Sequence, residues 1–257
     1  MTPPVYETDA LLHQYVLFHY GSAEDQLPYP FGPREALFYP VRCVNEHARF
    51  FEGARRALDL GCAVGRSTFE LARTCPEVIG IDLSQRFIQA AQSIQKSGTA
   101  EVARVEEGML VSRAQRALPI DIDRQRCRFL VGDATKFDPG LGTFDVVLAA
   151  NLIDRVRSPR QLLQNLINCL SPGGVLILSS PYTWLAEFTP PREWLGGISD
   201  ETGKPQTTLA SLQDLLGSTC DLLATRDLPF LLREHARKFQ WSVAQATVWR
   251  RRASAGR

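Results

Sequence analysis

The chain lacks an excess of charge of either sign. Its 257 residues include 29 Lys and Arg against 28 Asp and Glu, which gives a formal net charge of +1. Proteins that bind nucleic acid usually carry a strongly basic surface, so this balance predicts neither a DNA nor an RNA partner. The basic cluster at residues 250–252 lies close to the C-terminal end, and we expect it to be a solvated tail.

Long apolar runs and paired cysteines are also lacking. No run reaches the roughly 18 apolar residues that a membrane-spanning helix needs, and the first residues lack the basic and apolar regions of a signal peptide. The 6 cysteines are scattered without a C-x-x-C pair. We therefore expect reduced core cysteines in a cytoplasmic protein, with no membrane contact and no metal site.

Residues 57–67, with the sequence ALDLGCAVGRS, form the most informative segment that the chain does contain. A short apolar run carries an acid, Asp59, two glycines follow, and a helical pattern begins directly after the second glycine. Residues 78–82 form another apolar run, which ends in the carboxylate of Asp82. Together the two segments predict a βαβ unit that binds a nucleotide-like ligand over the carboxyl ends of its strands, with Asp82 accepting hydrogen bonds from ribose hydroxyls.

The glycine spacing distinguishes between two such ligands. A dinucleotide site needs G-x-G-x-x-G, whereas this loop has Gly61 and Gly65 with Ala63 midway between them. The loop resembles motif I of class I methyltransferases, with Ala63 in the place of one glycine. This resemblance implies S-adenosylmethionine (AdoMet) as the cofactor and makes a nicotinamide-dependent oxidoreductase the least favoured interpretation. The residues of these two segments that we expect to bind AdoMet are Asp59, Gly61, Cys62, Ala63, Gly65, Arg66, Asp82 and Leu83.

Two later segments support an AdoMet site. Residues 128–134 predict a third strand, after which Asp133 would accept a hydrogen bond from the adenine amino group and the Ala134 amide would face the ring. Residues 143–151 form an apolar, β-branched run that is typical of a buried central strand. The run ends at Asn151, which we expect to lie beside the transferred methyl group and to contact the cofactor.

The class I resemblance also implies how the chain is organised. We expect an α/β, Rossmann-like fold with a seven-stranded, mostly parallel sheet that contains one antiparallel strand. Residues 1–45 would form an N-terminal helical lid, and residues 46–257 would form the methyltransferase domain. Insertions into that domain are expected at about 98–126 and 182–205.

Nearly the whole chain also resembles one particular methyltransferase family. The matching segments are YETD at 6–9, FHYG at 18–21, PYPFGP at 28–33, PVRC at 40–43, PYTWL at 181–185, EFTP at 187–190, WLGG at 194–197 and REHARKFQWS at 233–242. They are similar to the 4-mercaptohistidine methyltransferases of ovothiol biosynthesis. This resemblance implies methylation of an imidazole nitrogen of 5-thiohistidine to give ovothiol A, a free-standing form of the enzyme, and a sulfoxide synthase as a partner.

An imidazole acceptor places chemical requirements on the site. The attacking nitrogen must be unprotonated and aligned with the sulfonium methyl, and an arginine suits the carboxylate of an amino acid. We expect Arg42, Tyr182 or Arg233 to bind that carboxylate, and His19 or His235 to lie beside the imidazole. The expected substrate-binding residues are Tyr15, Tyr20, Arg42, Asn45, Tyr182 and Arg233, and the expected catalytic residues are Asn151, His19, His235 and Tyr182.

Other interpretations of the same motifs stay open. N-, S- or O-methylation of another small metabolite would use the same fold, because a fold does not determine a substrate. A non-catalytic AdoMet-binding subunit is less favoured, since the acidic and glycine positions of the motifs are all present. Residues 151–154, NLID, lack the [DN]-P-P-[YFW] sequence that is typical of methyltransferases acting on nucleobase amines, which again argues against a nucleic-acid substrate.

Overall fold

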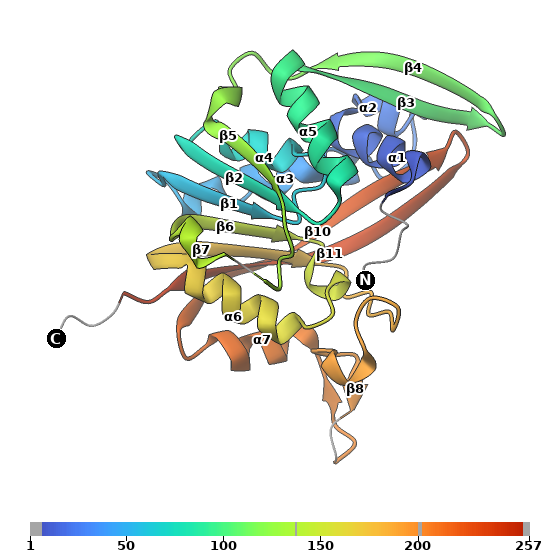
Figure 1. Cartoon of the computed structure of the whole chain (residues 1–257). Helices are drawn as coiled ribbons and strands as arrows, with labels where there is room; N and C mark the ends of the chain where they lie inside the picture. The colour runs from blue at the N-terminus through green and yellow to red at the C-terminus, as the bar shows by residue number, and fades with distance from the viewer. Residues whose placement is uncertain (1–6, 137, 200–201, 254–257) are drawn as a thin grey trace.

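A seven-stranded sheet forms the centre of the molecule, in the order β10-β11-β7-β6-β1-β2-β5. The computed structural model describes residues 7–136, 138–199 and 202–253, and helices cover both faces of its sheet (Figure 1). In the described sheet, β11 pairs antiparallel with both of its neighbours, β10 and β7, and the remaining pairs are parallel, which confirms the predicted α/β fold. The strands are β1 (Arg56–Leu60), β2 (Glu77–Asp82), β5 (Cys127–Val131), β6 (Phe144–Ala150), β7 (Leu170–Ser180), β10 (Cys220–His235) and β11 (Lys238–Arg251).

Double coverage of the sheet explains the composition of its central strand. In β6, the consecutive residues Val146, Val147 and Leu148 are all 0% exposed. Successive side chains of a strand point to opposite faces, so a strand covered on both sides must be apolar at every position. The uninterrupted apolar run that predicted this strand therefore reflects its central position.

The helices that follow β1 and β2 begin at the carboxyl ends of those strands. α4 (Arg66–Leu71) and α5 (Gln85–Ser97) lie on one face of the sheet, and α6 (Pro159–Cys169) and α7 (Thr208–Leu216) lie on the other (Figure 1). The hydroxyl of Ser84 caps α5 by accepting from the Phe87 amide, and Gly98 ends the helix in a left-handed conformation. Such caps fix where each helix starts relative to the loop before it.

Among the described residues, three α-helices precede the sheet, namely α1 (Asp9–Tyr20), α2 (Ala23–Gln26) and α3 (Tyr39–Asn45). α1 packs against β10 and against the inserted strand β3 (Thr99–Glu107). Tyr6 of the YETD segment lies outside the described residues. The lid role of this N-terminal region stays a prediction.

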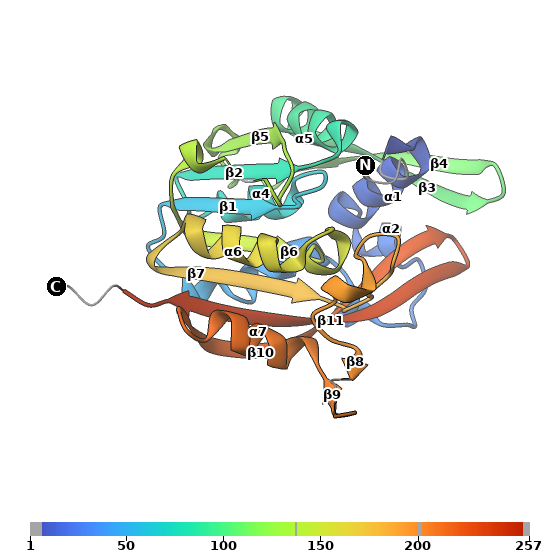
Figure 2. The ribbon, with the colours of Figure 1, turned by 60° about the horizontal axis from the view of Figure 1, so that its bottom comes forward.

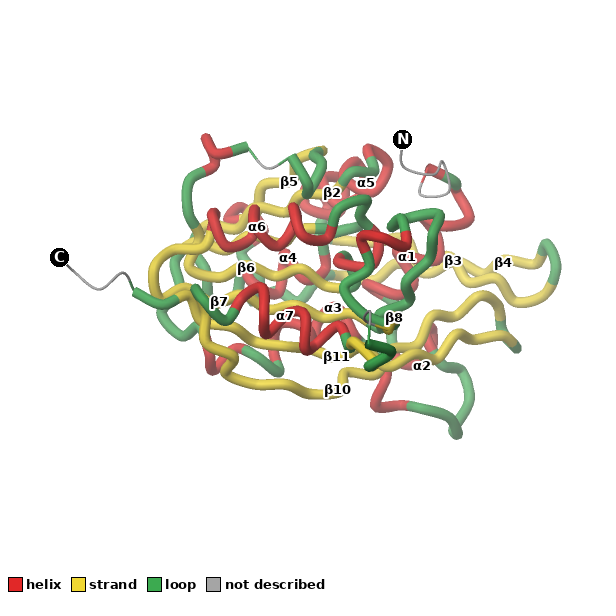
Figure 3. The backbone as a smooth tube through the Cα atoms, turned by 90° about the horizontal axis from the view of Figure 1, so that it is seen from below, coloured by secondary structure: helices red, strands yellow, loops and turns green. Residues whose placement is uncertain are grey.

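Both expected insertions contain short antiparallel pairs. The first holds the hairpin of β3 and β4 (Leu110–Ala117), which extends to the same side of the molecule as the distal end of the β10–β11 hairpin (Figures 1 and 3). The second holds a ribbon of β8 (Ile198–Ser199) and β9 (Pro205–Gln206), which projects away from the sheet (Figure 2).

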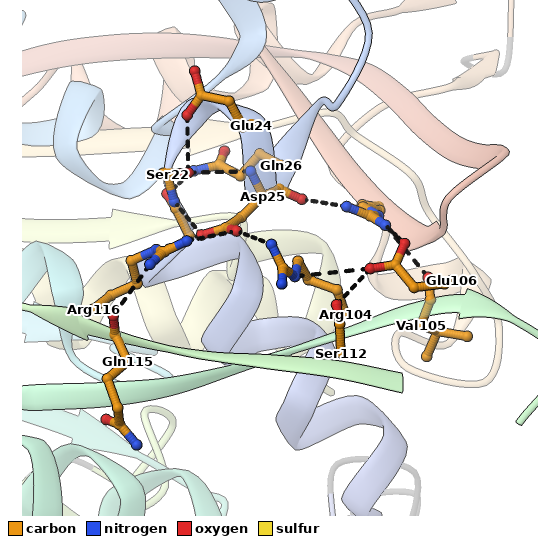
Figure 4. Close-up of polar contacts among 12 residues, drawn as sticks. Ser22, Glu24, Asp25, Gln26, Arg104, Val105, Glu106, Ser112, Gln115 and Arg116 are labelled. Carbon is orange, nitrogen blue, oxygen red and sulfur yellow. Dashed lines mark hydrogen bonds and ion pairs between the residues drawn. The ribbon is translucent and has the colours of Figure 1, made fainter. Parts of the chain in front are cut away.

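A buried carboxylate links the β3–β4 hairpin to α2. Asp25 is 0% exposed and accepts from Nη1 of Arg104 at 2.7 Å and from Nε of Arg116 at 2.6 Å (Figure 4). Burial alone would raise the pKa of Asp25, but the hydrogen bond from Arg116 and the charges of both arginines hold that pKa below its usual value. Arg233 of β10 joins the cluster by donating to the Asp25 carbonyl at 2.7 Å and to Glu106 at 2.7 Å.

The structure corrects the expectation of a solvated C-terminal tail at residues 250–252. β11 includes Arg250 and Arg251, and Arg252 directly follows the strand. Arg251 donates to the carbonyl of Ile167 at 3.0 Å, and Arg252 pairs with Asp221 at 2.7 Å. The basic cluster therefore fastens the last strand to its surroundings.

The cysteines occupy the expected environment. All 6 are free and buried, as the core assignment predicted. Within the described ranges, none of the helices combines the length and the apolar character that crossing a bilayer requires.

Candidate active site

A cavity opens at the carboxyl ends of β1, β2, β5 and β6, where class I resemblance predicted a ligand. Gly61 and Ala63 line it from the loop after β1, Asp82 from the end of β2, Asp133 from the loop after β5, and Asn151 from the end of β6. Its empty volume is about 1330 Å³ when counted to the open mouth. The lining residues come from several neighbouring strands, so the cavity extends from the loop after β1 to the end of β6.

Asp59 supports the loop after β1 from behind. Its side chain is 1% exposed and accepts from the hydroxyls of Ser67 and Thr68, both at 2.7 Å. Burial raises the pKa of Asp59 to about 6, against the opposing effect of these two hydroxyl donors. Asp59 therefore ties the first turn of α4 to the end of β1. Asp59, Cys62, Gly65 and Arg66 are not among the residues that line the cavity. Their contacts with AdoMet stay predictions.

Asp82 has the geometry of a ribose-binding acid. Its Oδ2 accepts from the Ala63 amide at 2.9 Å and its Oδ1 accepts from the Ser84 amide at 2.9 Å. Each carboxylate oxygen can accept a second hydrogen bond, which leaves both oxygens able to receive a hydroxyl from the cavity. Burial raises the pKa of Asp82 to about 6, so the group is a carboxylate at neutral pH.

We expect Asp82→Ala to weaken AdoMet binding by about 1–3 kcal/mol, because the ribose hydroxyls lose their acceptor and Ala63 loses its tether. Isothermal calorimetry with AdoMet measures this loss directly. Asp123→Ala is the matched control, since Asp123 also caps a backbone amide, that of Gln125 at 3.0 Å, but lies outside the cavity. Equal affinities of Asp82→Ala and the wild type would remove Asp82 from the cofactor site.

The adenine end of the predicted site lies beside β5. Oδ1 of Asp133 accepts from the amide of Thr135 at 2.9 Å and from its hydroxyl at 2.7 Å. Ala134 lines the cavity next to it, and Leu83 exposes an apolar side chain from the loop after β2. An acceptor beside an apolar surface suits the amino group and face of a purine, which supports the predicted adenine position.

Asn151 stands in a strained conformation at the other side of the cavity. Its φ is +49°, and its amide donates to the Ser179 carbonyl at 2.7 Å. The Tyr39 hydroxyl donates to Oδ1 of Asn151 at 2.7 Å and lies 2.8 Å from Oγ of Ser179. Such strain costs about 1–3 kcal/mol and persists where surrounding structure imposes it, frequently in active sites.

Aromatic rings form much of the wall around Asn151. α1 contributes Tyr15 and Phe18, and the rings of Phe18 and Tyr39 stack with centroids 5.9 Å apart. Phe230 of β10 lies 4.9 Å from Tyr39, and Phe87 of α5 lies 4.8 Å from Tyr15. Side chains from the N-terminal helices, α5 and the C-terminal hairpin thus give this part of the cavity an aromatic wall next to the predicted methyl position.

His19 also lines this part of the cavity, and its predicted role beside an imidazole stays a prediction. It is 8% exposed, and its Nδ1 has no hydrogen-bond partner among the described residues. Burial, and then the positive charge of Arg66, lower the pKa of His19 to about 3. The imidazole is therefore neutral at physiological pH.

The buried His19 should make the protein less stable in acid. Because its pKa falls from 6.5 to about 3 on folding, the unfolded state binds more protons between these values. The unfolding free energy then decreases as pH falls through this window, by up to about 1.4 kcal/mol per pH unit. We expect His19→Phe to reduce the loss between pH 7 and pH 5, measured by urea denaturation, by about 2 kcal/mol. Identical losses in the variant and the wild type would contradict this assignment.

Five of the six predicted substrate-binding residues do not line the cavity. Arg42 donates from Nε to Glu46 at 2.6 Å and from Nη1 to the Pro229 carbonyl at 2.9 Å. Arg233 is committed to the Asp25 cluster, and Asn45 is exposed at the end of α3. The structure therefore corrects the expected location of these side chains.

Of the remaining predicted residues, one supports the loop after β1 and two lie away from the cavity. Tyr20 is buried and donates to the Val64 carbonyl at 2.6 Å, so it braces the loop after β1. Tyr182 has a φ of +54° and donates to Gln245 at 3.0 Å, beside a separate cavity. His235 lies at the end of β10, where its Nδ1 accepts from the Arg237 amide. Tyr15, His19 and Asn151 are the predicted acceptor-side residues that the structure brings together.

Comparison with known proteins identifies the family of the chain. A family model described as a methyltransferase domain matches residues 52–221, and the chain belongs to this family. The ubiquinone biosynthesis O-methyltransferase of Xanthomonas oryzae pv. oryzae is 25% identical over 151 residues, which cover 58% of this chain and 53% of that relative. The chain thus spans about half the length of this curated relative.

Solved structures share the fold at low sequence identity. A SAM-dependent methyltransferase from Methanosarcina mazei has a TM-score of 0.54 and 17% identity, with coverage of 82% of this chain and 98% of that one. The N-methyltransferase NodS from Bradyrhizobium japonicum has a TM-score of 0.50 and 16% identity, with coverage of 81% and 93%. The family match and the fold together make the chain a class I AdoMet-dependent methyltransferase, which confirms the predicted cofactor.

Proposed function

We propose that this enzyme methylates an imidazole ring nitrogen of 5-thiohistidine, the final step of ovothiol A biosynthesis. The aromatic enclosure next to Asn151 is the observation that supports this proposal best, because flat rings stack on aromatic side chains. The identity of the acceptor comes from the resemblance of the sequence segments to the ovothiol methyltransferases. Two of those segments, 18–21 and 40–43, contribute or adjoin the enclosing residues Phe18, His19 and Tyr39.

The residues of the site suit transfer to a neutral nitrogen. AdoMet, when bound, supplies an electrophilic sulfonium methyl group. The hydrogen bonds among Tyr39, Asn151 and Ser179 fix the side chains at one edge of the acceptor space, and a fixed edge favours a defined orientation of the acceptor. The low pKa of His19 keeps this side chain neutral, so it does not repel the positive charge that moves from sulfur to the acceptor nitrogen.

O-, S- or N-methylation of another small metabolite is the second candidate. It is favoured by the match to a ubiquinone biosynthesis O-methyltransferase over 58% of this chain. Both candidates use the same cofactor position, so they differ only in the acceptor that the aromatic enclosure receives.

The proposal is tested by incubating the purified protein with AdoMet and 5-thiohistidine and following the gain of one methyl group by mass spectrometry. We expect product from 5-thiohistidine and none from histidine, because the sulfur substituent belongs to the recognised acceptor. Asp82→Ala serves as the control for dependence on the cofactor site. Absence of product from a protein that still binds AdoMet would refute the thiohistidine proposal and leave the second candidate.

A further inference from the structure

Arg155 is the one arginine or lysine among the described residues that line the cavity. It ends a short 3-10 turn, Ile153–Arg155, that directly follows the end of β6 and Asn151. Since His19 is neutral, Arg155 supplies the positive charge of the described wall. The cavity can therefore attract an anionic group at this point.

The surrounding residues hold the guanidinium of Arg155 in place. Its Nη1 donates to Oδ2 of Asp154 at 2.9 Å and to the Thr183 carbonyl at 2.9 Å. Its guanidinium carbon lies 5.1 Å from the ring centroid of Phe188. Asp154 is itself 0% exposed and accepts from the Thr183 amide at 2.9 Å, so the partner of Arg155 is fixed as well.

This arrangement leaves part of the guanidinium available. The hydrogen bonds of Arg155 to described residues all use Nη1, whereas Nε and Nη2 have no hydrogen-bond partner among them. A carboxylate can bind two neighbouring N–H groups of a guanidinium at once, and a guanidinium that is already oriented loses little entropy in doing so. Arg155 thus has both the charge and the free donors that a carboxylate needs.

The order of the sheet places Arg155 on the acceptor side of the cavity. The predicted ribose and adenine contacts, Asp82 and Asp133, lie at β2 and after β5, on one side of β1. Arg155 follows β6 and bonds to Thr183, which comes after β7, on the other side of β1. A group bound by Arg155 therefore lies across the cavity from the predicted adenosine position.

We propose that Arg155 binds the carboxylate of the methyl acceptor, so that the acceptor is an aromatic or heteroaromatic amino acid. This inference rests on the proposed function for its account of the aromatic enclosure. A carboxylate could also come from the methionine end of AdoMet, and the experiment must separate the two sources. The assignment replaces Arg42 and Arg233, which are paired elsewhere in the structure.

The test compares the affinities of amino acids with those of the corresponding amino alcohols, measured on the protein saturated with S-adenosylhomocysteine. Calorimetry measures 5-thiohistidine against 5-thiohistidinol, and phenylalanine against phenylalaninol. We expect the wild type to prefer each acid by about 10–100-fold and Arg155→Gln to abolish this preference. AdoMet affinity should stay within about twofold in the variant. Arg128→Gln is the control, because Arg128 is an exposed arginine of β5 outside the cavity.

Two results would overturn the assignment. One is a wild type that binds neither acid, or that binds acids and alcohols equally. The other is an Arg155→Gln variant that loses AdoMet affinity while keeping the acid preference, which would assign Arg155 to the cofactor carboxylate. A wild type that methylates 5-thiohistidine without an acid preference refutes this inference alone. A wild type that forms no product but binds acids through Arg155 refutes only the thiohistidine proposal.

Discussion

Replacing Asp25 with alanine is expected to lower the free energy of unfolding by about 3–5 kcal/mol, the scale for removing one partner of a buried ionic cluster. The side chain is 0% exposed, and its removal leaves Arg104 and Arg116 without their carboxylate. It also removes half of the capping box of α2, because Asp25 accepts from the Ser22 amide at 2.9 Å, whereas the cap by the Ser22 hydroxyl remains. Urea denaturation at neutral pH measures the change.

A surface pair in the same hairpin provides the control. Glu101 and Arg113 lie 2.6 Å apart with side chains 52% and 49% exposed, so Glu101→Ala should change stability by less than about 1 kcal/mol. The folded pKa of Asp25 lies below its usual 3.8. Its electrostatic contribution is therefore complete above that pH and is lost as pH falls through the folded pKa. A similar, small effect of both substitutions would show that the cluster does not hold the hairpin.

The core of the fold could be predicted because its signals are local in the sequence. β1, β2 and β6 are short apolar runs, and the polar residues at or just after their ends face one edge of a parallel sheet. The caps at Ser84 and Gly98 are equally local, since each depends on backbone groups within four residues. These features fix the cofactor side of the cavity with little help from distant contacts.

The inserted hairpin could not be predicted on the same grounds. Most residues of β4 are polar or partly exposed, and the apolar Val102 of β3 is buried. What holds the hairpin is α1 together with Asp25, both of which lie far away in the chain. A position set by such distant partners cannot be predicted from the local sequence alone.

On the acceptor side of the cavity, the role of a single residue also could not be predicted from the local sequence. An arginine that binds a substrate and one that pairs with a neighbouring glutamate look alike in sequence, and Arg42 pairs with Glu46. Tyr39 was not among the predicted residues, because no spacing indicates that its hydroxyl reaches Asn151, 112 positions away. Arg155 was also missed, although it directly follows the NLID segment that ends at Asp154.

Replacing Gly61 with valine is expected to weaken AdoMet binding by about 100-fold or more, equivalent to about 2.7 kcal/mol. Gly61 has a φ of +77°, which side chains rarely adopt, and an added Cβ would lie 3.0 Å from Cδ1 of Leu152. Leu152 and Gly61 both line the cavity. The new valine side chain therefore pushes Leu152 into the space that the cofactor needs. Calorimetric titration with AdoMet measures the loss, and methyl transfer should fall in parallel.

Gly53→Val separates this steric effect from backbone strain. Gly53 has nearly the same φ, +79°, but a Cβ added there would meet nothing within 4 Å. Both variants should lose about 1–3 kcal/mol in the free energy of unfolding, because a residue with a side chain is strained at a positive φ. Only Gly61→Val should lose the cofactor, because only at Gly61 does the added side chain press on the cavity wall. If both variants bound AdoMet as the wild type does, the cofactor could not pass over Gly61, and the predicted path of AdoMet along the first loop would have to be abandoned.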